Sequence, residues 1–138
     1  MPLLGNDTDG AVTRKRLETW AAKEEKVTVV AATDAATVQA AATLAAAGNV
    51  IYTMTPSTGR TLTTPTGAEL GAAFTDEAVG TSFKFSVVNL AGATHAVTLT
   101  AGASGVTLVG AVAVAAATSA SFAAVFTATD TVIIYRVA

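Results

Sequence analysis

The chain of 138 residues has no cysteine and only one histidine. Without cysteine it can form neither a disulfide nor a thiolate site. His95 alone cannot supply the ligands of a closed zinc site, and a catalytic triad would also need a nucleophile and an acid placed around it. Asp76 and Glu77 are adjacent, so their side chains project in different directions and make a poor acid–base pair. We therefore expect no enzymatic activity, no metal site and no cofactor, and a solvated or structural role for His95.

Charged residues are scarce and unevenly placed. They make up 13% of the chain, against about 25% in an ordinary soluble domain. Ten of the eighteen lie in the first 26 positions, and the 45 residues from Phe85 to Thr129 contain none. Sheet edges that face water normally carry charges that prevent aggregation. We therefore expect other subunits to cover this surface, and we predict a homo-oligomer, specifically a homotrimer.

The sequence also argues against a nucleic-acid-binding surface, a signal peptide and a membrane span. The net charge of -2 and the pI near 5.2 provide no basic surface for nucleic acid. The N-terminal segment lacks the basic stretch and apolar run of a signal peptide. The uncharged residues 108–126 have the length of a membrane span, but Val112 and Val114 alternate with alanine and Gly110 interrupts the run. We expect neither nucleic acid nor a membrane as a partner.

The sequence is instead rich in residues that favour strands, with 24 threonines and 17 valines. Phe83, Phe85 and Val87 share one face of a half-buried strand that ends at Leu90. Further strands are predicted at Val27–Ala32, Val50–Thr55, Arg60–Thr64, Ala96–Thr100, Val106–Val109, Ala111–Ala115, Ser121–Ala128 and Thr131–Val137. The last of these is apolar on both faces and should lie centrally. Short strands at this spacing predict a mainly β fold, an antiparallel β-sandwich or jelly-roll-like domain over residues 27–138.

Two short helices are predicted within this domain. Thr66 and Glu69 have the spacing of a capping box, and Leu70 lies on the inner face of the helix that would follow. The alanine-rich residues 41–47 favour one or two helical turns.

Residues 1–26 form a separate charged arm, whose second half has the pattern of a short amphipathic helix. Leu17 and Trp20 lie on one face, while charged residues that include Arg14 and Arg16 occupy the remainder. A helix of about 12 residues is marginal in water, so its apolar stripe needs a partner. That partner is either the chain's own domain or a neighbouring subunit. We assign Leu17, Trp20, Arg14 and Arg16 as the interaction residues of the arm.

Several runs resemble, in their order along the chain, a β-rich module of tailed-bacteriophage virion proteins. The resemblance covers residues from about 43 to 137. It is carried by Thr58-Gly59-Arg60-Thr61-Leu62 through Leu70, Val79-Gly80-Thr81-Ser82-Phe83 through Asn89, Val97 through Gly110, and the ending Tyr135-Arg136.

This resemblance implies a virion structural protein that is similar to capsid decoration, or cement, proteins. Such proteins are commonly trimers seated between capsomers, so the expected partners are other copies of the chain and the major capsid protein, at the capsid surface of the virion. The alternative is a tail-fibre, spike or other appendage module that binds a host surface glycan. A small hydrolase using His95 is a third hypothesis, which the missing triad disfavours.

Overall fold

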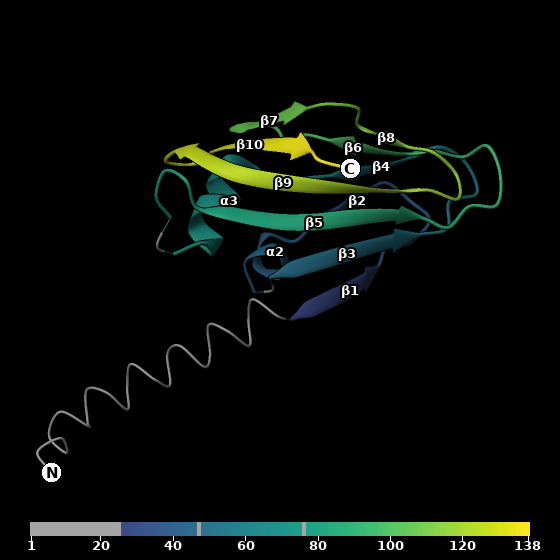
Figure 1. Ribbon diagram of the computed structural model, residues 1–138, viewed down its shortest axis with the longest axis horizontal. Coiled ribbons are helices and arrows are strands. Elements are labelled where there is room, and N and C mark those ends of the chain that lie inside the picture. The colour runs from purple at the N-terminus through teal and green to yellow at the C-terminus, as the bar shows by residue number, and fades with distance from the viewer. Residues whose placement is uncertain (1–25, 47, 76) are drawn as a thin grey trace, which may run out of the picture.

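The computed structural model describes residues 26–46, 48–75 and 77–138. Within these residues the chain is mainly β, as the sequence predicts, with ten strands in two sheets and two short helices. The helical arm predicted within residues 1–26, and with it all four of its interaction residues, lies outside the described part (Figure 1).

The larger sheet has six strands and the smaller has four (Figure 1). The order of the six-stranded sheet is β1 (Val27–Ala31), β3 (Asn49–Met54), β5 (Ser82–Asn89), β9 (Ser119–Ala128), β10 (Thr131–Arg136) and β7 (Val106–Val109). The order of the four-stranded sheet is β2 (Thr37–Val38), β4 (Arg60–Thr63), β6 (Val97–Thr100) and β8 (Ala113–Val114). The helices are α2 (Ala41–Ala46) and α3 (Gly67–Ala73).

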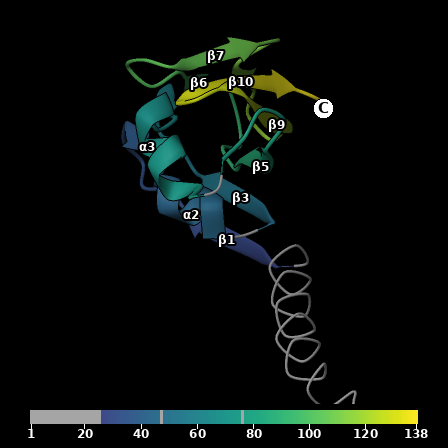
Figure 2. The same ribbon diagram turned by 90° about the vertical axis from the view of Figure 1, so that its left-hand side faces the viewer.

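The first six strands alternate between the two sheets, so the chain winds in three successive turns. The turns are β1 with β2, β3 with β4, and β5 with β6, and each strand pairs in parallel with the corresponding strand of the next turn. α2 follows the first turn and α3 the second, and the two helices lie together at one end of the body (Figure 2).

The predicted antiparallel arrangement is wrong for most of the pairings. Only β5–β9, β9–β10 and β6–β8 are antiparallel, whereas the three turns and the β7–β10 pair are parallel. Parallel neighbours need a crossover connection, and here each crossover passes through the opposite sheet as a short strand. Because that strand and its flanking turns are short, their spacing in the sequence is the same as that of a series of hairpins.

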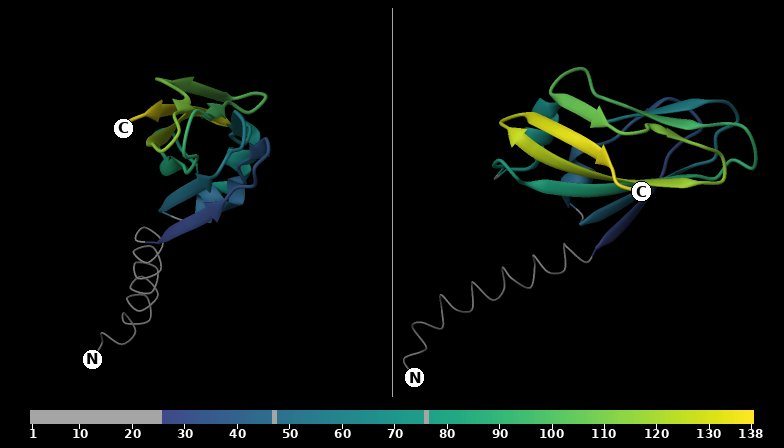
Figure 3. Two further views of the ribbon diagram at one scale, coloured as in Figure 1. Left: turned by 90° about the vertical axis from the view of Figure 1, so that its right-hand side faces the viewer. Right: turned by 45° about the horizontal axis from the view of Figure 1, so that its top comes forward.

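One apolar core lies between the sheets. Phe83, Phe85 and Val87 point into it as predicted and are buried. The ring of Phe85 stacks on that of Phe122 in β9, with centroids 5.2 Å apart, and Phe74 at the end of α3 stacks on Phe83 at 5.0 Å. The long strands β5 and β9 run side by side along the body (Figure 3). The last strand, predicted to be central, is an interior strand, because β10 lies between β9 and β7, but only the short β7 separates it from the edge of the sheet.

The capping box predicted for α3 is confirmed. The Thr66 hydroxyl accepts a hydrogen bond from the Glu69 amide at 3.2 Å, and the Glu69 carboxylate accepts one from the Thr66 amide at 2.8 Å. Gly67, the first helical residue, packs against the turn at Asp130, where a Cβ atom would collide with the Asp130 carbonyl oxygen. Its amide donates to the carbonyl of Ser104 at 2.9 Å. A glycine at this position therefore lets the helix start directly on the β9–β10 turn.

Candidate interaction surfaces

The outward side of the six-stranded sheet, called here the outer face, is broad and nearly uncharged. Its side chains alternate with those that enter the core, and Lys84 is the one charged residue among them. The other members are uncharged and include Val27, Val29, Asn49, Ile51, Thr53, Ser86, Val88, Ser121, Ala123, Val125, Ile133, Tyr135, Thr107 and Val109. Val29 is 63% exposed and Tyr135 is 41% exposed. A surface of this composition is suited to contact with another protein surface.

The sheet edges are uncharged as well. β1 and β7 are the edges of the larger sheet and β2 and β8 those of the smaller, and within the described ranges none of these strands contains Asp, Glu, Lys or Arg. Monomeric proteins usually place charges on edge strands to prevent pairing with another chain. The uncharged edges therefore favour the same interpretation as the outer face.

Asp34 joins the first and second turns of the chain. Its carboxylate accepts hydrogen bonds from the Arg60 side chain at 2.6 Å and from the backbone amide of Ser57 at 3.1 Å, and also from the Ser57 hydroxyl. The hydrogen bond from Arg60, followed by those from Ser57, holds the pKa of Asp34 well below its usual range. Asp34, Ser57 and Arg60 are thus hydrogen-bonded to one another, and we interpret the cluster as a structural link between the first two turns.

His95 lies in the loop between β5 and β6 and is half-buried. Its carbonyl accepts a hydrogen bond from the side chain of Asn89 at 2.7 Å, and its amide donates to Ala93. Among the described residues no side chain bonds to the imidazole, and no three His, Asp or Glu side chains are placed to hold a metal ion. Neither described helix is long and apolar enough to cross a membrane.

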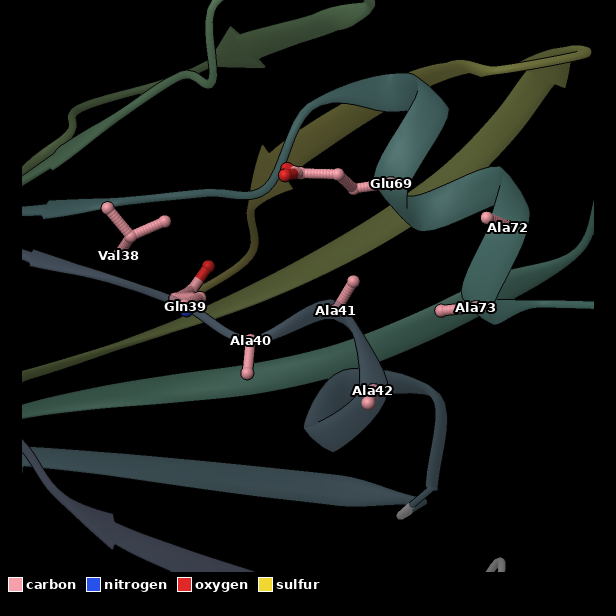
Figure 4. A pocket seen from close by; sticks show the side chains of 8 residues that line it. All are labelled: Val38, Gln39, Ala40, Ala41, Ala42, Glu69, Ala72 and Ala73. Atoms are coloured by element: carbon pink, nitrogen blue, oxygen red, sulfur yellow. The ribbon is translucent and has the colours of Figure 1, made fainter.

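A groove of about 480 Å³ lies between the two helices, and we call it the α2–α3 groove (Figure 4). Its lining is almost entirely alanine and valine with two polar residues: Val38, Gln39, Ala40, Ala41, Ala42, Glu69, Ala72 and Ala73. Gln39 is buried, and Val38 is 65% exposed. Small side chains on both helices leave this space open.

Asn89 and Gln39 were missed as functional or structural polar residues by the sequence reasoning. A signal existed for Asn89, because it continues the inward series of Phe83, Phe85 and Val87 at the strand period yet is polar. Gln39 likewise follows Thr37 at the same period, on the core side of β2.

Comparison with known protein families, with curated proteins and with solved structures found no match to this chain. The proposal for function therefore rests on the surfaces and buried groups described above.

Proposed function

We propose that the protein is a non-enzymatic virion structural protein that decorates and stabilises a bacteriophage capsid as a homotrimer. The outer face carries this proposal. A free monomer would expose there a sheet of six strands whose described side chains include a single charge, Lys84, and contact with other copies would remove that surface from water. The major capsid protein would be the second partner, at the capsid surface.

The strand arrangement supports a sandwich in which the outer face serves as the assembly surface. The core residues come from both sheets, with Leu62 and Leu99 from the smaller sheet packed in the same cluster as Phe85. A jelly-roll-like order is disfavoured by the parallel pairing of the three turns. One core backs all six strands, and most interfaces of this kind form with little change in the backbone.

The charged arm is the second element of the proposal. Arg14 and Arg16 would present charge to a neighbouring subunit or to the capsid lattice, as the polar rim of an interface whose centre is apolar. Leu17 and Trp20 would be the apolar anchors that hold the arm in place, on the chain's own domain or on a neighbour.

A glycan-binding appendage module is the alternative that the experiment must separate. Binding of sugars usually relies on exposed aromatic rings. Tyr52 is buried and cannot serve in this way, whereas Tyr135 is exposed on the outer face. The decoration proposal is favoured because a single exposed tyrosine within the described residues forms no stacking platform.

Light scattering of the purified protein tests the self-association, and a cryo-EM map of the virion tests the location. Tyr135→Glu places a charge on the outer face and should dissociate the oligomer. Thr61→Glu, at an exposed position on the outward side of the smaller sheet, is the matched control and should not. A well-behaved wild-type monomer, or density for the chain only on tail fibres, would overturn the proposal.

A further inference from the structure

Gln39 has a buried side-chain amide that nothing in the described part of the chain satisfies. The residue is 2% exposed, and neither its Nε2 nor its Oε1 has a hydrogen-bond partner among the described groups. Its amide oxygen points toward the side of α3, as does the methyl group of Ala41 (Figure 4). Buried polar groups in native proteins are nearly always paired. Gln39 therefore indicates a hydrogen-bonding group that occupies the α2–α3 groove.

The neighbouring turns of the chain explain why Gln39 has no partner within the body. Thr64 holds the corresponding position one turn further along, and its hydroxyl accepts a hydrogen bond from the amide of Gly102 at 2.9 Å. The residue that stands in the place of Gly102 beside Gln39 is Pro65, because Gln39 pairs with the end of β4. Proline has no N–H to donate. The stack of turns thus satisfies Thr64 and leaves Gln39 facing the groove.

The N-terminal segment joins the body at β1, close to the C-terminal end of α2. The carbonyl of Lys26 accepts a hydrogen bond from the amide of Asn49 at 3.3 Å, and Asn49 begins β3 three residues after the last residue of α2. Trp20 precedes Lys26 by six residues, a span of about 9 Å in a helix or about 20 Å fully extended. α2 is itself about 9 Å long. An extended connection is therefore long enough for the tryptophan to pass along α2 to the groove of its own chain.

We propose that the α2–α3 groove holds the side chain of Trp20 from the same chain, with the side-chain oxygen of Gln39 accepting the indole N–H. Tryptophan has a large apolar body and a single donor, which matches alanine walls around one buried acceptor. The sequence leaves open whether the apolar stripe of the arm docks on its own domain or on a neighbour, and the unpaired Gln39 amide within reach of Trp20 favours its own domain. Arg14 and Arg16 remain outside the groove in this arrangement. The proposal does not depend on capsid decoration.

The fluorescence of the intact protein tests this docking, because Trp20 is the only tryptophan. We expect emission at a shorter wavelength than that of free tryptophan, unchanged on dilution. Ala72→Glu puts a charge on an exposed position of the groove wall and should shift the emission to longer wavelength and increase quenching by acrylamide. Ala68→Glu, on the same helix but outside the lining, is the control and should cause neither change. Solvent-like emission of the wild type, or a shift on dilution that places Trp20 on another copy, would overturn the proposal.

A double-mutant cycle tests the hydrogen bond itself, by thermal unfolding of the full chain. Gln39→Leu should lower the unfolding temperature of the wild type, because the indole N–H loses its acceptor. In a Trp20→Phe background the same substitution should leave the unfolding temperature unchanged or raise it, because phenylalanine has no donor and the amide is then unpaired. Equal effects of Gln39→Leu in both backgrounds would show that the two side chains do not contact each other.

Discussion

The side chain of Asn89, at the end of β5, donates a hydrogen bond to the carbonyl of Val114 in β8 at 2.9 Å, and so joins the two sheets. The same Nδ2 donates to the His95 carbonyl at 2.7 Å, and the Oδ1 accepts from the amide of Ala91 at 3.0 Å. Asn89 is 1% exposed. One buried side chain thus satisfies three backbone groups, two in the β5–β6 loop and one in β8.

Asn89→Ala should lower the free energy of unfolding by about 3 kcal/mol, because buried backbone groups that lose a partner each cost roughly 1–3 kcal/mol. Denaturant unfolding measures the change. Asn49→Ala is the matched control, since Asn49 lies at the start of β3 on the outward side of the sheet and should change stability by about 0.5 kcal/mol or less. If both variants have the same effect, the hydrogen bonds of Asn89 do not determine the stability of this end of the body.

Gly67→Ala should be among the most destabilising substitutions in the chain. The added methyl group would collide with the carbonyl of Asp130 and lie 2.9 Å from the Cα of Gly105. Both obstacles are backbone, so α3 or the β9–β10 turn must shift, and we expect a loss of about 4 kcal/mol. Gly59→Ala should instead be neutral or stabilising by about 0.5 kcal/mol, because a Cβ there meets nothing within 4 Å and alanine restricts the unfolded chain. A Gly67→Ala protein as stable as Gly59→Ala would contradict the packing described for α3.

Tyr52→Phe should stabilise the protein. The hydroxyl of Tyr52 is buried without a partner among the described residues, and burial raises its pKa to about 12. Removing an unpaired buried hydroxyl should add about 1 kcal/mol to the free energy of unfolding.

The same substitution should change the alkaline behaviour of the protein. The folded pKa of Tyr52 is raised above the ordinary value near 10. The free energy of unfolding is therefore independent of this group below about pH 10, and it falls as the pH rises toward 12, because the unfolded chain loses the proton more easily than the folded protein. The phenylalanine variant should therefore lose less stability than the wild type over that interval. Urea unfolding of the two proteins at the two ends of this interval measures the loss. An equal loss of stability in the wild type and in the variant would exclude a contribution from Tyr52.

The periodicity of the sequence predicted most strand positions because inward residues such as Phe83 and Phe85 repeat every second position whether a strand is paired in parallel or antiparallel. For the same reason it could not predict which strands are neighbours. The capping box of Thr66 and Glu69 was predictable since its residues are close in sequence. The unpaired Gln39 and the α2–α3 groove could not be predicted. They depend on the register between β2 and β4, which places Pro65 beside Gln39.

Asp34→Asn should destabilise the protein at neutral pH, and the difference from the wild type should become smaller as the pH falls from about 4 toward 2. The folded pKa of Asp34 is lowered by Arg60 and Ser57, so the ionised carboxylate stabilises the folded state above the unfolded pKa, which is about 3.9. That contribution is lost as the pH falls through the folded pKa. Because the Arg60 and Asp34 side chains are 28% and 37% exposed, solvent screens the pair, and we expect a smaller effect than for Asn89→Ala.

Thermal unfolding of both proteins between pH 7 and pH 2 measures this difference, and NMR titration of the Asp34 carboxyl measures its cause. In an Arg60→Gln variant the pKa of Asp34 should rise, because the strongest hydrogen bond to the carboxylate is weakened. A stability difference between wild type and Asp34→Asn that is constant over the whole pH range would assign the effect to packing. A pKa that does not respond to Arg60→Gln would show that Ser57 alone holds the carboxylate, and that the first and second turns are joined by one side chain fewer than the structure indicates.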